Sequence, residues 1–328
     1  MPPKDNSVSP SEDTGQAVCS QCQQESYKDY QDSVHGRSRA GDELDAAACQ
    51  DCHGGHNIFK KEDSRSPVYH LNLPQTCARC HADAKLASRH RLGEGKEYKL
   101  FMDSIHGRAI TKSGLLVAAN CSDCHGTHRI YPPEDSRSSV NRVNIPATCG
   151  KCHAGITPIY RESIHGQGLT GGVINVPVCT DCHTAHQIVS VTGESWKLGI
   201  IQECGTCHQS LLTTYRDTYH GKVTSLGYVR VARCSDCHGA HDIRPVSDPQ
   251  SRISPARIVS TCRRCHPKAN ANFARYYPHA DYKNKDLYPS LYYTYFFMTT
   301  LLVGVFGFFG LHMALWLVRD GWEWLRRK

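Results

Sequence analysis

The apolar positions of this chain are concentrated in one segment near its C-terminus. From Leu291 to Val318 no side chain is charged, and only threonine, tyrosine, glycine and one histidine interrupt the apolar run. As a helix these 28 residues would be about 42 Å long, enough to cross a hydrocarbon layer of about 30 Å with some tilt. The alternative, a buried core helix, is less favoured because helices of soluble cores rarely run this long without charge. We therefore predict a transmembrane helix over residues 291–318.

The flanks of this segment predict its orientation. Tyrosines gather near its start and tryptophans near its end, as is typical of the two membrane–water interfaces. Residues 319–328 carry four positive charges, which favour the cytoplasmic side. We expect a single-pass protein of the inner (cytoplasmic) membrane, with residues 282–290 as a juxtamembrane linker, residues 319–328 as a cytoplasmic basic tail, and the preceding chain in the periplasm.

The rest of the chain shows little helical or alternating periodicity, and glycine, proline and serine interrupt it throughout. Only 39% of all residues are hydrophobic and 9% aromatic, and the membrane segment takes a large share of these. A conventional side-chain core is therefore excluded, and a bulky cofactor is expected to fill the interior. The predicted fold is mostly α with little regular structure, with short helices around the cysteines, long connectors and almost no sheet.

The 18 cysteines form nine Cys-x-x-Cys pairs in a repeated order. Four pairs read C-x-D-C-H-x-x-H, and four read C-x-x-C-H without the second histidine. A first pair, Cys19 and Cys22, is followed by Gln23 instead of histidine. A His-Gly element lies 14 or 15 residues before each C-x-D-C pair, so the order recurs four times within residues 19–281.

Cys-x-x-Cys-His is the attachment sequence of c-type haem, in which two thiols add to the haem vinyl groups and the histidine binds iron. Paired cysteines also build zinc sites, but zinc does not require histidine directly after the second cysteine. Histidine follows eight of the nine pairs here, which favours haem. We expect eight haems on the following cysteines: Cys49, Cys52, Cys77, Cys80, Cys121, Cys124, Cys149, Cys152, Cys179, Cys182, Cys204, Cys207, Cys234, Cys237, Cys262 and Cys265.

An electron carrier is expected to hold each iron between two strong axial ligands. Predicted proximal ligands are His53, His81, His125, His153, His183, His208, His238 and His266. Predicted distal ligands are His35, His106, His165 and His220 of the His-Gly elements, His56, His128, His186 and His241 of the His-x-x-His motifs, and His279 by register.

The His-x-x-His spacing suggests close haems. On a helix, side chains three positions apart have Cβ atoms about 5 to 6 Å apart. If one imidazole binds its own haem and the other a neighbouring haem, the two irons lie near each other. We therefore expect a chain of haems.

Several single features remain outside the repeat. A ninth haem at Cys19 and Cys22 is left open. His312, inside the membrane segment, is expected either to help bind a b-type haem or a quinone shared with a partner, or to reach the membrane interface. His70 and His90 are expected on the surface. The Asp-Ser-Arg-Ser sequences at Asp63 and Asp135 predict turns with a salt link.

With these motifs in place, the chain resembles the multihaem c-type cytochromes of anaerobic respiratory bacteria. Residues 276–320 are similar to the end of membrane-anchored multihaem modules associated with b-type cytochrome quinol oxidoreductases. The resemblance implies a membrane b-type cytochrome or quinol dehydrogenase subunit as donor. Residues 1–18 form a polar N-terminal tail without a visible signal peptide. Haem attachment outside the cytoplasm requires export, so we expect a start further upstream or a fragment.

We expect a non-enzymatic electron-transfer protein that connects the quinol pool to periplasmic c-type cytochromes or a terminal reductase. Electrons would enter near His266 and His279, which lie nearest the membrane segment in sequence. The alternative is a multihaem reductase of nitrite, hydroxylamine or a sulfur oxyanion with one open haem. No nucleic-acid partner is expected, because the 38 basic residues are interspersed with 31 acidic ones.

Overall fold

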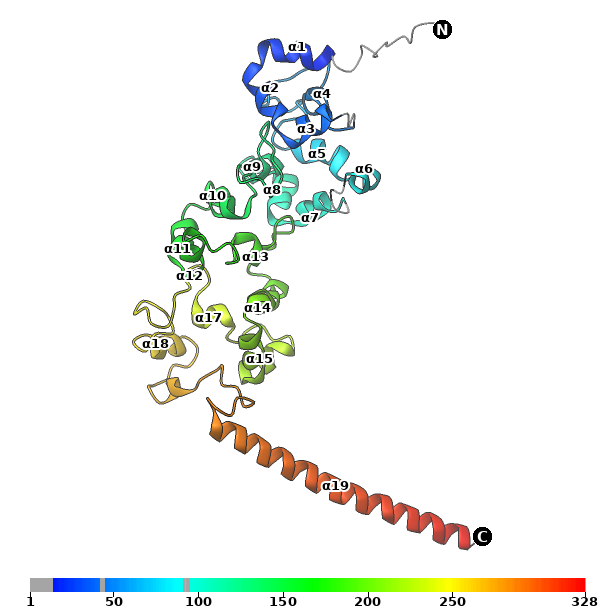
Figure 1. Cartoon of the computed structure of the whole chain (residues 1–328), viewed down its shortest axis with the longest axis vertical. Helices are drawn as coiled ribbons and strands as arrows, with labels where there is room; N and C mark the ends of the chain where they lie inside the picture. The colour runs from blue at the N-terminus through cyan, green and yellow to red at the C-terminus, as the bar shows by residue number, and fades with distance from the viewer. Residues whose placement is uncertain (1–13, 42–44, 91, 93–94, 328) are drawn as a thin grey trace, which may run out of the picture. The chain divides into compact units, whose positions relative to one another are not determined.

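The computed structural model describes residues 14–41, 45–90, 92 and 95–327, and all regular secondary structure in these ranges is helical. The prediction of a mostly α fold with short helices is confirmed, whereas the expectation of little regular structure is wrong, because 56% of the described residues are helical (Figure 1). Most of the predicted N-terminal tail, residues 1–13, lies outside the described residues. The chain divides into two compact units, one comprising 1–204 and 232–261 and the other 205–231 and 262–328.

The first unit contains short helices that carry the predicted repeat. Its helices are α1 (Thr14–Cys22), α2 (Gln24–Gln31), α3 (Val34–Ala40), α4 (Cys49–His53), α5 (Leu73–His81), α6 (Ala84–Arg89), α7 (Glu97–Asp103), α8 (Ile105–Ser113), α9 (Cys121–His125), η1 (Arg142–Asn144), α10 (Ile145–Gly150), α11 (Ile156–Glu162), α12 (Ile164–Thr170), α13 (Cys179–His183), most of α14 (Glu194–Cys207), α17 (Cys234–His238) and most of α18 (Ile258–Arg263). Helix α10 contacts both α9 and α13.

The second unit contains the end of the repeat and the apolar segment. Its helices are α15 (Gln209–Asp217), α16 (Tyr219–Ser225), η2 (Phe273–Arg275) and α19 (Pro289–Arg326). Helices α15 and α16 pack against each other.

Very few large side chains are buried among the described residues. The largest of the fully buried side chains are one valine, one proline and seven serines. These serines cap helices and turns through hydrogen bonds to the backbone. The most deeply buried side chains therefore mainly serve hydrogen bonding and do not form a hydrophobic core. The expectation that no conventional core forms is therefore met in the described part of the chain.

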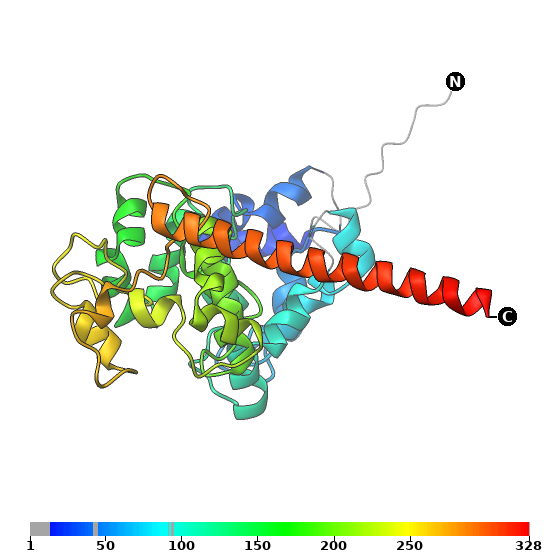
Figure 2. The same cartoon turned by 90° about the horizontal axis from the view of Figure 1, so that it is seen from below.

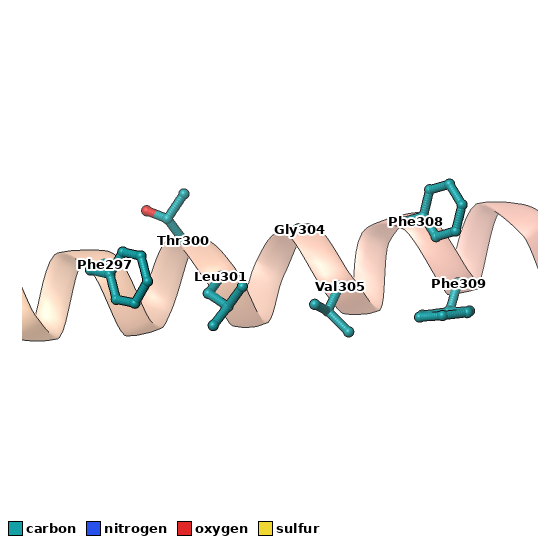
Figure 3. A pocket seen from close by; sticks show the side chains of 7 residues that line it. All are labelled: Phe297, Thr300, Leu301, Gly304, Val305, Phe308 and Phe309. Carbon is teal, nitrogen blue, oxygen red and sulfur yellow. The ribbon is translucent and has the colours of Figure 1, made fainter.

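Helix α19 contains the predicted membrane segment and is longer than predicted at both ends. It begins at Pro289, a favoured first-turn residue because proline has no N–H to leave unsatisfied. Its 38 residues correspond to about 57 Å. Both views show it as one continuous helix (Figures 1 and 2). None of its described residues is buried, and one side presents the apolar surface from Phe297 to Phe309 that Figure 3 labels. The helix is thus long and apolar enough to span a membrane.

The two Asp-Ser-Arg-Ser sequences form the predicted turns with salt links. Asp63 accepts from the backbone N–H of Arg65, and its carboxylate lies 2.7 Å from the guanidinium. Asp135 and Arg137 repeat this geometry with the same 2.7 Å distance. Arg137 also pairs with Asp32 at 2.6 Å, which ties the turn to a residue three positions before His35 of the first His-Gly element.

Candidate haem-binding sites

Each His-Gly histidine is placed by a capped helix. Ser104 precedes α8, accepts a hydrogen bond from the Gly107 N–H at 3.0 Å and donates one to the Phe101 carbonyl at 2.5 Å. Capping satisfies backbone groups that a helix start leaves free. The side chains of Ser33, Ser163 and Thr218 make the same two hydrogen bonds in the other copies. These capping residues were not identified from the sequence, although the recurring S-x-H-G and T-x-H-G pattern contained the signal.

The glycine after each of these histidines is required by a close backbone approach. A Cβ on Gly107 would lie 2.1 Å from the Phe101 carbonyl oxygen and 2.7 Å from the Met102 Cα. Equivalent Cβ atoms would lie 2.1 Å from a carbonyl oxygen in the other three copies, at Gly36, Gly166 and Gly221. The glycine lets the histidine helix lie against the helix before it.

The aspartate of each C-x-D-C-H motif caps the helix that carries the cysteines. In α9, Asp123 accepts from the Asn120 N–H at 2.8 Å, which is the side-chain-to-backbone half of a capping box. The equivalent bonds of Asp51, Asp181 and Asp236 measure 2.6 to 2.9 Å. The motif therefore fixes a one-turn helix with the proximal histidine as its last residue.

The helical geometry expected for His-x-x-His is wrong. The helix ends at the proximal histidine, and the next residue has a positive φ: +85° at Gly54, +84° at Gly126, +63° at Thr184 and +90° at Gly239. This conformation costs an ordinary residue energy but suits glycine. It turns the chain so that the second histidine leaves the helix, and Thr184 is the only non-glycine residue with positive φ among the described residues.

The structure brings twelve predicted ligands together in six pairs of imidazoles. The pairs and their ring-centroid distances are His35–His81 (6.2 Å), His53–His128 (6.1 Å), His106–His153 (6.2 Å), His125–His186 (6.0 Å), His183–His241 (6.0 Å) and His220–His266 (6.1 Å).

These distances fit one metal ion between two imidazoles. An imidazole nitrogen binds a transition metal at about 2.0 to 2.1 Å and lies about 1.1 Å from its ring centroid, so two rings on opposite sides of an ion have centroids about 6.2 to 6.4 Å apart. Aromatic pairs in general have centroids about 4.5 to 7 Å apart, so the informative feature is that all six distances lie between 6.0 and 6.2 Å and involve only predicted ligands. The residues present therefore fit a haem iron with two axial histidines.

The pairs follow a regular sequence rule. Three of the four His-Gly histidines pair with the histidine of a simple C-x-x-C-H motif 46 or 47 residues later. Three of the four second histidines of His-x-x-His pair with the proximal histidine of the preceding C-x-D-C-H copy. His125 and His128 thus belong to different pairs, as the expected chain of neighbouring sites requires.

Backbone hydrogen bonds join the two kinds of distal element. The Val34 N–H donates to the Ile130 carbonyl at 2.8 Å, and Ile105 and Ile164 donate to Ile188 and Ile243 at the same distance. In each case the donor lies next to a His-Gly histidine and the acceptor lies two residues after a His-x-x-His histidine. One bond therefore orients two distal imidazoles at once.

Cysteine pairs that follow one another in the sequence also lie close together in space. A hydrogen bond between the thiols of Cys77 and Cys121 raises the pKa of Cys77 and lowers that of Cys121. Cys149 and Cys179 interact in the same way, and so do Cys204 and Cys234. Burial, with a contribution from Cys77, raises the pKa of Cys52 to about 11. In a haem-bound protein these thiols would be thioethers, so the contacts indicate which attachment sites are neighbours.

Partial burial keeps paired histidines in the form that binds metal. Desolvation lowers the pKa of His125 below the usual histidine value, and the neighbouring His186 lowers it further. The pKa of His183 is lowered by desolvation and by His241. Neutral imidazoles are the metal-binding species.

The other predicted ligands are placed individually. His165 is the second residue of α12, after the Ser163 cap, and His238 is the last residue of α17, whose first turn Asp236 caps, as in their equivalents. His208 follows α14. His279 is half-buried, and its Nδ1 lies 3.1 Å from Thr214 Oγ1, which orients the ring. His56 is exposed, whereas His128, His186 and His241 are half-buried, and its ring pairs with no described histidine.

The expectation that His70 and His90 are surface residues is wrong. His70 is half-buried, with Nε2 2.8 Å from the Ala118 carbonyl oxygen and Nδ1 3.1 Å from Asn120 Nδ2. His90 Nε2 lies 2.9 Å from Asp45. His312 is exposed on α19. Polar partners hold the first two as structural links.

No group of three or more His, Cys, Asp or Glu side chains is arranged around a possible metal position in the part of the chain that the structure describes. A tetrahedral zinc site needs such a group, whereas haem iron needs only two protein ligands.

No family model matches the chain, no curated protein matches its sequence, and no solved structure matches its fold.

Proposed function

We propose that this chain is a membrane-anchored octahaem c-type cytochrome that transfers electrons between a membrane donor and periplasmic acceptors. The observation that carries the proposal is the set of six imidazole pairs with centroids 6.0 to 6.2 Å apart. One histidine of every pair directly follows a Cys-x-x-Cys sequence. His165 and His279 complete the proposed set of eight distal ligands, because His165 has the capped helix of its equivalents and His279 has an oriented ring.

Bis-imidazole haem iron supplies one-electron chemistry with little change in geometry between Fe(III) and Fe(II). The residues of this chain hold the two imidazoles of each pair apart at the right distance, since each sits on a capped helix or a fixed turn. The two histidines of one His-x-x-His motif belong to different pairs, and thiols of successive Cys-x-x-Cys pairs are in contact. Both observations support close spacing of successive attachment sites. Close spacing favours transfer along the array, because electron tunnelling weakens steeply with distance.

The donor is proposed to be the quinol pool or a membrane b-type cytochrome. The second unit contains both the His220–His266 pair and α19, so one polypeptide unit joins a proposed haem to the membrane segment. We assign electron input to this second unit and place the first unit in the periplasm. Soluble c-type cytochromes or a terminal reductase of anaerobic respiration would accept the electrons. His312 is proposed to contribute to a b-type haem or quinone site with a partner helix.

The alternative, a reductase of nitrite, hydroxylamine or a sulfur oxyanion, requires an iron with an open position. One observation favours a single such site: the first cysteine pair is followed by Gln23.

The test is expression of the full chain with an export signal in a host that attaches c-type haem. The expected product is red after denaturation, since thioether bonds survive it, and its mass exceeds the bare chain by eight or more haems. Electron paramagnetic resonance of the oxidised protein should be dominated by low-spin iron. A colourless denatured chain, or predominantly high-spin iron, would overturn the proposal.

A further inference from the structure

The first cysteine pair lies where the haem-binding pairs lie. Cys19 is close enough to Cys49 to raise the pKa of that thiol, in addition to the larger effect of burial. Cys77 meets Cys121, and Cys149 meets Cys179, in the corresponding positions of later copies. Helix α1 also contacts α4, as α5 contacts α9 and α10 contacts α13. The pair is therefore built into the array like its equivalents.

Gln23 has the backbone geometry of a proximal histidine. Its N–H donates to the Cys19 carbonyl at 2.9 Å, and His153 and His266 donate at 2.9 Å to the first cysteine of their own pairs. Its φ and ψ, −109° and 49°, nearly equal the −103° and 49° of His208. Only the imidazole is missing.

Solvent exposure follows the same pattern. Cys19 is half-buried while Cys22 and Gln23 are exposed, which is also the sequence of exposure at Cys204, Cys207 and His208. A short helix and a capped His-Gly helix follow in both copies, as α2 and α3 follow Gln23 and α15 and α16 follow His208. Every local element of an attachment site is thus present at Cys19 and Cys22.

We propose that Cys19 and Cys22 bind a ninth haem whose iron lacks a proximal imidazole and therefore takes small exogenous ligands. This inference rests on the proposed function. In attachment, each thiol S–H adds across one vinyl C=C, which forms a C–S and a C–H bond and requires no oxidant or reductant. The exposed, neutral amide of Gln23 is a weak ligand that a small molecule can displace. The site would accept molecules that bind iron through one atom, and carbon monoxide is the probe.

The test combines mass and ligand binding on the full, haem-loaded chain. We expect nine haems, one equivalent of carbon monoxide per reduced protein, and a minority high-spin resonance in the oxidised protein. The paired substitutions Cys19→Ala and Cys22→Ala should remove one haem and abolish carbon monoxide binding. Gln23→His should keep nine haems and supply an imidazole to this iron, which should change the absorption and stretching bands of its carbon monoxide complex, and it requires no change in the fold.

The outcomes separate this inference from the function it rests on. Absence of covalent haem overturns both. Eight haems with two alkylatable thiols at Cys19 and Cys22 overturns only the ninth site. Nine haems without high-spin iron or carbon monoxide binding overturns the open coordination. The matched control, Cys149→Ala with Cys152→Ala, should remove one haem but leave the original carbon monoxide site intact.

Discussion

Replacing Gly107 with alanine tests whether the His-Gly elements position iron ligands. The new Cβ would lie 2.1 Å from the Phe101 carbonyl oxygen, whereas real Cβ contacts are essentially never shorter than 3.0 Å. Helix α8 must therefore move by about 1 Å away from the preceding helix, and His106 moves with it. Overpacking of this kind costs about 1 to 3 kcal/mol.

The displacement is large compared with a coordination bond. The His106 and His153 ring centroids are 6.2 Å apart, and a metal–imidazole bond of about 2.0 to 2.1 Å cannot lengthen by about 1 Å and remain a bond. We expect Gly107→Ala to retain all covalent haems but to convert one from low-spin to high-spin. The reduced protein should bind one more equivalent of carbon monoxide than the parent protein.

The matched control is Gly155→Ala, two residues after His153. An added Cβ there meets no atom within 4 Å, and the backbone is helical with φ −72° and ψ −27°. This variant should have the spectrum and carbon monoxide stoichiometry of the parent protein. If Gly107→Ala is equally silent, His106 does not depend on the glycine contact and the ligand assignment is refuted.

Three further results are expected. Thr184→Gly should raise the free energy of unfolding by about 0.5 to 1 kcal/mol in chemical denaturation. Relief of the positive φ outweighs loss of the exposed 2.8 Å hydrogen bond that the threonine hydroxyl donates to the Gln187 carbonyl. A free energy of unfolding below that of the parent protein would contradict the backbone strain. The Arg137 side chain lowers the pKa of Asp135 to about 2. The ionised Asp135 therefore stabilises the fold above the unfolded pKa of about 4, and this stabilisation is lost as pH falls from about 4 to about 2. Asp135→Asn should remove this part of the acid dependence of Tm, and an unchanged profile would argue against the ion pair. The holoprotein should focus near or below neutral pH, because eight oxidised haems change the formal charge from +7 to about −1, and a strongly basic holoprotein would contradict the haem count.

The sequence was sufficient for features that depend on composition and local spacing. The uncharged run from Leu291 to Val318 identified the long apolar helix, and glycine, proline and low apolar content indicated short helices without a core. The helix ends at Pro289 and Arg326 were missed because polar flanking residues continue a helix without any hydrophobic signal.

The partners of the histidines could not be predicted, because they depend on tertiary contacts between residues 46 to 75 positions apart. His53 pairs with His128 and not with its sequence neighbour His56. The helical interpretation of His-x-x-His failed because the residue after the proximal histidine turns at positive φ, which three glycines signalled and Thr184 did not. Ser104 illustrates a missed local signal, since a serine or threonine precedes every His-Gly element by two positions.

The central claim is that imidazole pairs in this chain bind covalently attached haem iron. Its most direct test is the intact mass of the purified, denatured full chain, together with the pyridine haemochrome spectrum that counts its c-type haems. We predict at least eight haems per polypeptide, in thioether linkage. A mass equal to the bare 36.6 kDa chain, with all 18 cysteines open to alkylation, would contradict the account.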